Sequence, residues 1–581
     1  MPLSKVFHPN ALRERFFSHE ASPRTFRGPG DSLPPQLFCL TVVLYACYLA
    51  AMQSDWVLAG EMWAEMATNY FPAANAQSIG ERLFSTDAGY IPLPQRLLAY
   101  LGSLLRLPAS AVPYFYTWSG IAATAMMVGA FCLRPFRAVV NSDSLRFVTA
   151  ISVLLLADFE TRTFINFTYY VPFLAAIVTA LALADDSVDV PAWAWILPIL
   201  MLSKPAALTV LPAMILVAFV SRRRFRLITL VATLVCLAQV VQLVLSHKGG
   251  AFVPTAEISR LDKLHASIRY FFGYVGYYTT GTALDTNIFG RILSGLAIAA
   301  FCLVSLLASG RRSHALLVVG LSLLFWNLLL NCFALSDTWN LDMARLQGAP
   351  IYRHIIVGFF GVVLMVASLA ALLSERRRES SGALRASLGA VLMLAWLAGS
   401  GWLAFAGALN RVPGLPTTQN SQWQQMAQAI DAGVPVCVPV DPLGWMYGIQ
   451  CKQLNPEITR ENSYRFAALP TGGAGSYFLA PPPDGLDGKS LISLAAMVRP
   501  TSNRTGPINA MAIVRTKDGT SRYFTGAREL PATGGLILLT SDLPVATEDI
   551  ASIRLSFGSP VALAFEASKS ANTPAILWMG R

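Results

Sequence analysis

The stretch ILSGLAIAAFCLVSLLASGRRSHALLVVGLSLLFWNLLLNCFA, residues 292–334, holds two apolar runs that are separated by Arg311 and Arg312. Each run has about 20 residues, the length that an α-helix needs to cross the hydrocarbon core of a bilayer. The rest of the chain has a similar character, since 54% of its 581 residues are hydrophobic and only 13% are charged. A soluble protein carries roughly twice that charged share. The sequence therefore predicts a polytopic α-helical membrane protein.

The predicted topology follows from the loops between the apolar runs. Residues 1–35 are polar and basic and predict a cytoplasmic N-terminal tail. Arginines are concentrated in alternate loops, for example at 222–226 and 376–385, which the positive-inside rule assigns to the cytoplasm. The formal charge of +11 is therefore interpreted as a topology signal, and no nucleic-acid partner is predicted. Eleven spans place the C-terminus outside: 36–54, 113–133, 146–158, 168–184, 190–203, 206–220, 226–246, 290–309, 314–334, 354–373 and 385–407.

The last 170 residues or so differ in character from the spans. Residues 408–488 are predicted to form a linker and a small α/β segment. From 489 to 581, short and partly alternating segments such as INAMAIVRT are separated by turn residues, which predicts an extracytoplasmic, mainly-β, sandwich-like domain. Cys437 and Cys451 flank a turn-rich segment of this tail. An oxidising compartment favours a disulfide between them, and two unpaired core thiols are the alternative.

The first predicted outside loop, 55–112, is apolar and aromatic but contains several acids. In DWVLAGEMWAEMATNYF, Glu61, Glu65 and Asn69 recur every four residues, so they share one face of a predicted helix. Asp55 lies where the chain leaves the first span. These acids are interpreted either as a functional group or as an ordinary solvated face.

Cations on other predicted outside segments have no acidic neighbours in the sequence. Lys204 lies in MLSKPAAL, and Arg269 lies in the predicted loop 247–289. Acids on one loop and cations on others predict a single polar pocket at the outer leaflet, with separate structural ion pairs as the alternative.

The motifs limit the chemistry of such a pocket. The chain has no GxxxxGK[ST], no GxGxxG that opens a helix, and no HExxH, so no cofactor is predicted, and a divalent metal is an alternative that no motif supports. A transferase at the outer face then needs a donor that is carried on a lipid. A lipid phosphate requires cations, and an acceptor hydroxyl requires a carboxylate to accept its proton.

The order of these features resembles the GT-C superfamily of integral membrane glycosyltransferases, which use polyprenyl-phosphate-linked sugars. The resemblance rests on SDWVLAGEMWAEMATNYF after the first span, DAGYIPLPQRLL, the short spans around LSKP, APIYRHII before a late span, and a soluble C-terminal tail. In architecture it covers residues 36–407, the predicted catalytic domain. The adjacent acid pair of many members is absent, because Trp56 follows Asp55.

The resemblance implies roles for particular residues. A carboxylate of the first outside loop acts as the general base, with Glu65 as the first candidate, followed by Asp55 and Glu61. The implied partners of the donor phosphate are Arg353, Lys204, Arg269 and Arg345. The implied substrate-binding residues are Asp87, Tyr90, Asn69, Tyr169, Tyr170, Trp339 and His354.

The predicted function is transfer of a sugar from a polyprenyl phosphate to a cell-envelope glycan or lipid-linked acceptor. The predicted location is the periplasmic face of a bacterial inner membrane, and a one-step displacement inverts the anomeric carbon. A polymerase or ligase of whole glycans, a transporter or flippase of lipid-linked sugars, and a binding or assembly protein are the alternatives. No internal repeat is visible and the span interiors carry few charges, which argues against a transporter.

Overall fold

The computed structural model describes residues 33–580 except 157–159, 185–188, 247–258, 282–287, 309–313, 335–354, 377–381, 404–417, 419, 435, 443–444, 449–451, 455–463, 469–476, 481–488, 502–505 and 567–573. The chain forms two compact units. We call them the helical unit, which comprises Met1–Met52, Gln77–Leu98 and Thr117–Leu415, and the β unit, which comprises Gln53–Ala76, Ala99–Tyr116 and Pro416–Arg581. The predicted first outside loop is thus divided between the two units.

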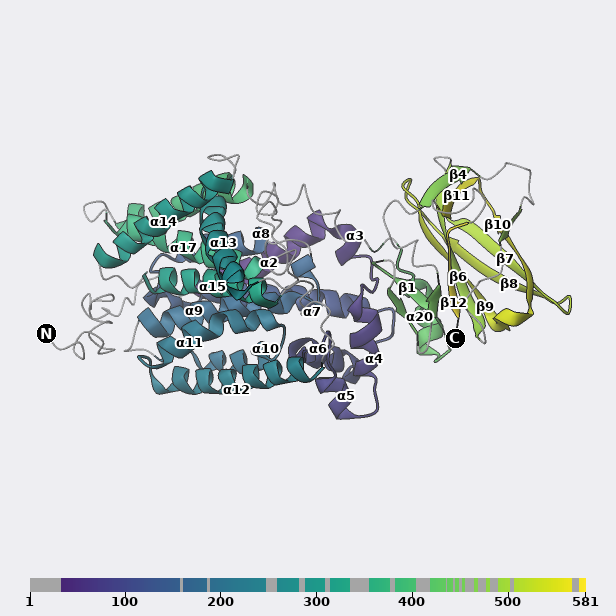
Figure 1. Cartoon of the computed structure of the whole chain (residues 1–581), viewed down its shortest axis with the longest axis horizontal. Helices are drawn as coiled ribbons and strands as arrows, with labels where there is room; N and C mark the ends of the chain where they lie inside the picture. The colour runs from purple at the N-terminus through teal and green to yellow at the C-terminus, as the bar shows by residue number, and fades with distance from the viewer. Residues whose placement is uncertain are drawn as a thin grey trace. The chain divides into compact units, whose positions relative to one another are not determined.

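Long apolar helices dominate the helical unit, and several of them run side by side in Figure 1. Seven helical stretches of the described residues are long and apolar enough to cross a membrane, which confirms a multi-pass membrane protein in outline. They are Leu33–Met52, Val112–Cys132, Phe167–Ala184, Arg223–Ser246, Phe289–Leu307, His314–Phe333 and Ile356–Ser374. The α-helices of these stretches are α2 (Leu33–Met52), α7 (Val112–Gly129), α9 (Val171–Ala184), α12 (Arg223–Ser246), α14 (Ile288–Ala308), α15 (His314–Ala334) and α17 (Ile356–Arg376). The stretch of α7 also includes η3 (Ala130–Cys132), and that of α9 includes η6 (Phe167–Tyr170).

The other four predicted spans coincide with shorter helices. Three apolar stretches, Ala192–Met201, Pro205–Ala218 and Leu388–Gly401, fall on predicted spans, and α8 (Asp143–Leu155) falls on the fourth. The 13 residues of α8 span about 20 Å, less than the roughly 30 Å of a bilayer core. The count of eleven spans therefore stays a prediction. These stretches contain η7 (Ala192–Ile196), α10 (Leu197–Met201), η8 (Pro205–Val210), α11 (Leu211–Ala218), α18 (Gly382–Trp396) and η11 (Leu397–Gly401).

The helix α12 has one exposed apolar face and one buried face. Its exposed side chains recur with helical spacing at Leu230, Leu234, Leu237 and Val241, as expected for a surface that meets lipid. The opposite face packs against the rest of the unit. Its buried residues are Phe225, Ile228, Thr229, Ala232, Cys236 and Gln239.

One 21-residue helix was missed by the sequence analysis. The predicted loop 247–289 contains α13 (Arg260–Thr280), which packs closely on α14. A Cβ on Gly276 would collide with the backbone of Arg291, and a Cβ on Gly295 would collide with that of Phe272, so the glycines permit the close approach. Figure 1 draws α13 across the direction of its neighbours α14 and α15. Its charged and aromatic composition concealed it from a hydropathy search.

The helix predicted through Glu61, Glu65 and Asn69 is much shorter than expected. It begins with one π-helical turn, Met66–Tyr70, and continues as α4 (Phe71–Ala74). Glu61 precedes it, so the prediction that Glu61 shares a helical face with the other two is wrong. The other elements of the first loop are α3 (Ser54–Val57), α5 (Ile79–Phe84) and α6 (Leu93–Leu104).

A β-rich C-terminal region is confirmed. In the described part of this region, ten antiparallel strands form one connected sheet in the order β3-β12-β6-β9-β8-β7-β10-β5, with β11 paired to β4 and β6, and β1 and β2 form a separate hairpin. β8 and β9 meet at a single pair, Thr525 and Thr540. The strands are β1 (Val438–Val440), β2 (Trp445–Tyr447), β3 (Lys452–Leu454), β4 (Tyr464–Ala468), β5 (Tyr477–Ala480), β6 (Ser490–Pro500), β7 (Ile508–Thr516), β8 (Ser521–Arg528), β9 (Gly535–Ala546), β10 (Ile550–Phe557), β11 (Val561–Glu566) and β12 (Ile576–Gly580).

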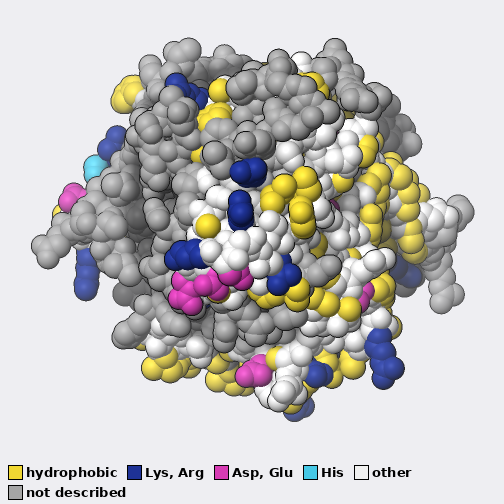
Figure 2. All heavy atoms as spheres, turned by 90° about the vertical axis from the view of Figure 1, so that its right-hand side faces the viewer, with side chains coloured by type: hydrophobic (Ala, Val, Ile, Leu, Met, Phe, Trp, Pro, Cys, Tyr) yellow, Lys and Arg dark blue, Asp and Glu magenta, His cyan; other side chains and the backbone are white. Residues whose placement is uncertain are grey.

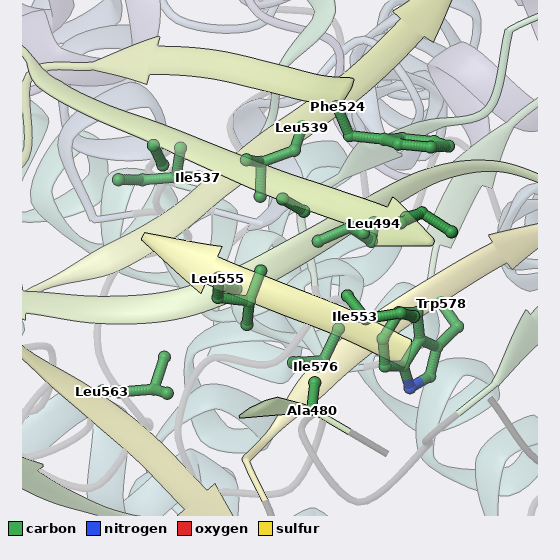
Figure 3. Close-up of a cluster of buried hydrophobic side chains, with 14 of the residues drawn as sticks. Ala480, Leu494, Phe524, Ile537, Leu539, Ile553, Leu555, Leu563, Ile576 and Trp578 are labelled. Carbon is green, nitrogen blue, oxygen red and sulfur yellow. The ribbon is translucent and has the colours of Figure 1, made fainter. Parts of the chain in front are cut away.

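The core of this region draws side chains from two groups of strands. Figure 3 shows Leu494 of β6 and Ile537 of β9 in the same cluster as Phe524 of β8 and Leu555 of β10. On the other face of β6, β9 and β12, a second cluster includes Met426 of α20 (Trp423–Asp431) and the strand β1. β6 and β9 are therefore covered on both faces, which explains their nearly continuous apolar sequences.

The cysteines divide as the sequence suggested. Six free cysteines lie in the helical unit: Cys39, Cys47, Cys132, Cys236, Cys302 and Cys332. Cys437 is buried just before β1, and Cys451 lies outside the described residues. The disulfide between Cys437 and Cys451 stays a prediction.

Candidate functional site

Lys204 lies at a break between two short helical stretches of the helical unit. α10 ends at Met201 and η8 begins at Pro205, so Lys204 occupies an extended position with ψ 146°. A proline disfavours the helical conformation in the residue before it, which explains why LSKP interrupts an apolar segment. The break presents a half-buried ammonium group at the end of two helices.

The Lys204 ammonium is held by two tyrosines. Its Nζ donates a hydrogen bond of 2.9 Å to the Oη of Tyr90. The same Nζ lies 5.3 Å from the ring centroid of Tyr90 and 5.2 Å from that of Tyr169. A cation over an aromatic face is attracted by the negative quadrupole of the ring. Three residues that the sequence analysis named separately therefore form one group, to which Asp87 adds a carboxylate.

Asp87 joins this group through a tight hairpin. The backbones of Asp87 and Tyr90 exchange hydrogen bonds of 2.8 and 3.0 Å, and the Tyr90 hydroxyl donates at 3.5 Å to Asp87 Oδ2. The two central residues, Ala88 and Gly89, have φ of 46° and 87°. Alanine is uncommon in this left-handed region, and such strain gathers at functional sites. We call Asp87, Tyr90, Tyr169 and Lys204 the lysine cluster.

Polar side chains of α6 position two segments that carry the lysine cluster. Gln95 Nε2 donates to the carbonyl of Ile165 at 2.9 Å and to the hydroxyl of Thr168 at 3.0 Å, next to Tyr169. Arg96 Nε donates at 3.2 Å to the carbonyl of Ser85, at the base of the hairpin. Both α6 side chains are fully buried. Neither residue was predicted from the sequence, although a Gln-Arg pair beside apolar residues in PLPQRLL is a visible signal.

The other predicted substrate and phosphate residues of the helical unit are not part of this group. Tyr170 is fully buried and packs on Phe360 with 5.1 Å between ring centroids. Arg269 is exposed on α13, away from its buried face. Trp339, Arg345, Arg353 and His354 lie outside the described residues.

Glu61 belongs to the β unit, where it caps a helix. Its Oε2 accepts hydrogen bonds of 2.8 Å from the Ser421 hydroxyl and of 2.8 Å from the backbone N–H of Trp423, the first residue of α20. An anion at a helix N-terminus is stabilised by the unpaired N–H groups and the helix dipole. The carboxylate that was a candidate base therefore links the first loop to the start of the C-terminal region.

Asp441, which directly follows β1, also connects the first loop to the start of the C-terminal region. It accepts hydrogen bonds from the backbone N–H groups of Asn420 and Ser421 at 2.8 and 3.2 Å. Its own carbonyl accepts from the N–H of Ala64, which has φ of 45°. Residues 63–64 are thus drawn into a bridge with Asp441, and the helix starts only after them.

Aromatic side chains pack around the start of α20 in the β unit. Trp423 is fully buried, and its ring lies 5.1 Å from Phe71 and 5.1 Å from Tyr447, measured between centroids. Its Nε1 donates at 2.7 Å to the carbonyl of Ala109. Trp56 and Trp63 are buried in the same unit.

The remaining candidate acids differ in exposure. Asp55 is exposed in α3, and its backbone carbonyl accepts from Thr418 at 3.2 Å. Glu65 and Asn69 are half-buried, with Glu65 at the start of the π-helical turn. π-Helical turns occur often at functional sites. Among the described residues, no group of three His, Cys, Asp or Glu side chains could hold a metal ion.

The acidity of Glu61 is set by its burial. Burial raises the pKa of Glu61 from 4.5 to about 7, although the Ser421 and Trp423 hydrogen bonds and the Arg528 charge oppose the rise. Burial likewise raises the pKa of Asp441 from 3.8 to about 6, against its hydrogen bonds to Asn420 and Ser421. Both carboxyls therefore bind protons more tightly in the folded β unit than when it opens.

The β unit around Glu61 and α20 is therefore expected to become less stable as the pH rises. Between pH 4.5 and about 7 the opened carboxyl is ionised while the folded one keeps its proton, so stability falls with pH and is constant above that range. The shift corresponds to about 3 kcal/mol. Hydrogen exchange at the backbone amides of Ser421–Gln424, corrected for intrinsic rates and measured on the full chain, should become faster as stability is lost.

Variants separate the two carboxyls. Glu61→Gln should remove the dependence above about pH 6, and Asp441→Asn should remove the part below pH 4.5, whereas both carboxyls contribute between these values. A Glu61→Gln protein with the wild-type pH profile of exchange would contradict this assignment.

Comparison with known proteins adds no relative from which a function could be transferred, so the resemblance to the GT-C superfamily stays a prediction. No protein-family model, no curated protein and no solved structure matches this chain.

Proposed function

We propose that this protein is a membrane glycosyltransferase of the GT-C type. It transfers a sugar from a polyprenyl-phosphate donor to a cell-envelope glycan or lipid-linked acceptor at the periplasmic face of a bacterial inner membrane. The observation that supports this most directly is the lysine cluster, where the Lys204 ammonium lies between two tyrosines at a break in apolar helices. A cation held at such a position is a functional candidate by default.

The lysine cluster suits an anionic ligand. Lys204 carries a positive charge on three donors, one of which is directed at Tyr90, and a phosphate offers several acceptor oxygens to such a group. The Tyr90 hydroxyl accepts from Lys204 and donates to Asp87, which keeps the ammonium oriented. In the proposed reaction Lys204 binds the donor phosphate and stabilises it as it leaves, and the rings of Tyr90 and Tyr169 border the site.

The general base is proposed to be Glu65, with Asp55 as the second candidate. Glu65 follows Ala64, whose left-handed backbone is a second strained position next to a candidate acid. Glu61 ranks lower, because its carboxylate already accepts two hydrogen bonds at the start of α20. The base removes the acceptor proton as the hydroxyl attacks the anomeric carbon, so the configuration inverts.

The C-terminal region is proposed to be an extracytoplasmic, sandwich-like domain that binds the acceptor. Figure 2, which views the right-hand side of Figure 1, shows acidic and basic side chains interspersed on that face. Balanced charge favours recognition of a glycan by hydrogen bonding over attraction of a polyanion. The exposed charged residues on β7, β8, β10 and their turns are Arg515, Lys517, Asp518, Arg522, Glu529, Glu548, Asp549 and Arg554.

The direct test is a donor panel. Purified protein would be incubated with several polyprenyl-phosphate sugars and a lipid-linked glycan acceptor, and release of the free lipid phosphate would be measured. We expect release with at least one donor, and a product of inverted configuration. No release with any donor, while the protein is folded, would contradict the proposal.

Transport and whole-glycan transfer are the alternative functions. A flippase would move an intact lipid-linked sugar across proteoliposomes without releasing lipid phosphate. A polymerase or ligase would release a lipid carrier only when the donor bears a complete glycan. The same panel, with single sugars and whole glycans as separate donors, distinguishes the three.

The topology of the proposal gives a further expected result. A membrane-impermeant protease or thiol probe on intact spheroplasts should reach the tail after residue 410 and miss residues 1–35, because the N-terminus is proposed to be cytoplasmic and the tail periplasmic. Inside-out vesicles are the control and should reverse the pattern. A tail protected in spheroplasts would contradict a reaction at the outer face.

A further inference from the structure

Gln239 is a buried polar side chain in a largely apolar helix. It is 1% exposed and lies on the packed face of α12, a helix that is long and apolar enough to cross a membrane. It precedes the last residue of α12, Ser246, by seven positions, about 10 Å along the helix axis. A polar group at such a position requires hydrogen-bond partners.

The partners of Gln239 are the two backbone segments that carry the lysine cluster. Its Oε1 accepts from the N–H of Ile91 at 3.2 Å, and its Nε2 donates to the carbonyls of Ile91 and Ser203 at 3.3 and 2.6 Å. Ile91 directly follows Tyr90, and Ser203 directly precedes Lys204. One amide group therefore holds both neighbours of the Tyr90–Lys204 pair.

These segments depend on such external support. Pro92 and Pro205 prevent a helix from continuing through the segment before them, and Ile91 and Ser203 lie outside the helices. The segments meet directly through a hydrogen bond of 3.0 Å from Leu93 N–H to the Leu202 carbonyl. Gln239 connects to both of these segments, directly beside Tyr90 and Lys204 of the lysine cluster. Ser246 makes a weaker contact of 3.3 Å to the Gly89 carbonyl.

We propose that Gln239 is a positioning residue that sets the Tyr90–Lys204 geometry and thereby the affinity of the cluster for its anionic ligand. The effect on the ligand rests on the proposed function, whereas the effect on Lys204 does not. Gln239 acts through the backbones of Ile91 and Ser203 and does not itself contact the ligand.

The test is the chemical reactivity of Lys204 in the full-length protein in detergent. Acetic anhydride, supplied at trace levels over a range of pH, acylates neutral amines, and mass spectrometry reports the extent at Lys204. Gln239→Met has about the same size but removes all three hydrogen bonds. We expect acylation of Lys204 to rise about tenfold, because the amine loses its hydrogen-bond acceptor and its two flanking rings.

Two variants make the result specific. Gln242→Met is the same change three residues along α12 and should leave Lys204 at its wild-type rate. Tyr90→Phe should raise the rate directly, and the double variant Gln239→Met/Tyr90→Phe should exceed the faster single variant by less than twofold, because both act on one contact. Wild-type reactivity in Gln239→Met, or multiplied effects in the double variant, would overturn the proposal.

Donor turnover provides the second readout. Gln239→Met should raise the KM for a polyprenyl-phosphate sugar about tenfold and change kcat less, because it disturbs binding and not the base. If the donor panel fails with wild-type protein, the proposed function falls, and acylation still decides the role of Gln239. If wild-type protein transfers the sugar but Lys204 acylation is unchanged in Gln239→Met, the proposed function stands and the positioning role of Gln239 is contradicted.

Discussion

Lys204→Met is expected to lower kcat/KM for a polyprenyl-phosphate sugar by about 100-fold. A hydrogen bond to a charged group contributes about 1.5–3 kcal/mol, and the variant removes the cation that meets the phosphate. Methionine retains a flexible apolar chain that can fill the space between the rings of Tyr90 and Tyr169. Steady-state release of lipid phosphate, measured across donor concentrations, checks the expectation.

Two further variants define the role of Lys204. Lys204→Arg keeps the charge but changes its shape, so it should retain part of the activity. Lys517→Met removes an exposed lysine of the β7–β8 turn, on the proposed acceptor surface, and should leave the KM for the donor at its wild-type value. If Lys204→Met kept normal kcat/KM, the lysine cluster would be a structural feature and the donor phosphate would bind elsewhere.

Glu65→Gln is expected to lower kcat by about 10²–10⁴-fold, the usual contribution of general base catalysis. Glutamine keeps the size and can still accept a hydrogen bond, but it cannot remove the acceptor proton. Donor binding should therefore survive, so that the KM for the donor changes little. Single-turnover assays with radiolabelled donor would separate binding from the chemical step.

The other acids serve as controls for Glu65. Glu61→Gln should affect the pH dependence of the α20 contact more than turnover, because Glu61 is engaged with Ser421 and Trp423. If instead Asp55→Asn abolished turnover and Glu65→Gln did not, the base would be the acid at the end of the first span. A product that retains the donor configuration would exclude one-step displacement even if a carboxylate proved essential.

Local composition was enough to predict the membrane segments and the strands. The seven long apolar helices fall on predicted spans because the need for about 20 apolar residues is satisfied within one continuous segment. INAMAIVRT alternates because β7 has one face in the core and one outside it. The continuous apolar character of β6 was visible in the sequence, but its cause was not, because α20 and β1 come from a different part of the chain.

The acidic loop shows where periodicity fails. Spacing by four placed Glu61 with Glu65, yet the bridge between Trp63 and Asp441 delays the start of the helix. Asp441 is nearly 400 residues away in the chain, so no local pattern reports it. α13 was missed for a related reason, since packing on α14 stabilises a helix whose composition is too polar to be recognised as a span.

The sequence by itself determined the class of protein, the positions of most apolar helices, the β-rich tail and a set of polar residues with the right chemistry. Only the tertiary structure decided which of them meet. Lys204 pairs with Tyr90 across 114 residues, while Glu61 binds the start of α20 across 362. Helix formation and membrane insertion depend on neighbours within a few turns, which a sequence displays directly. The lysine cluster depends on chain closure over long distances, and there prolines and buried amides such as Gln95 and Gln239 determine the geometry.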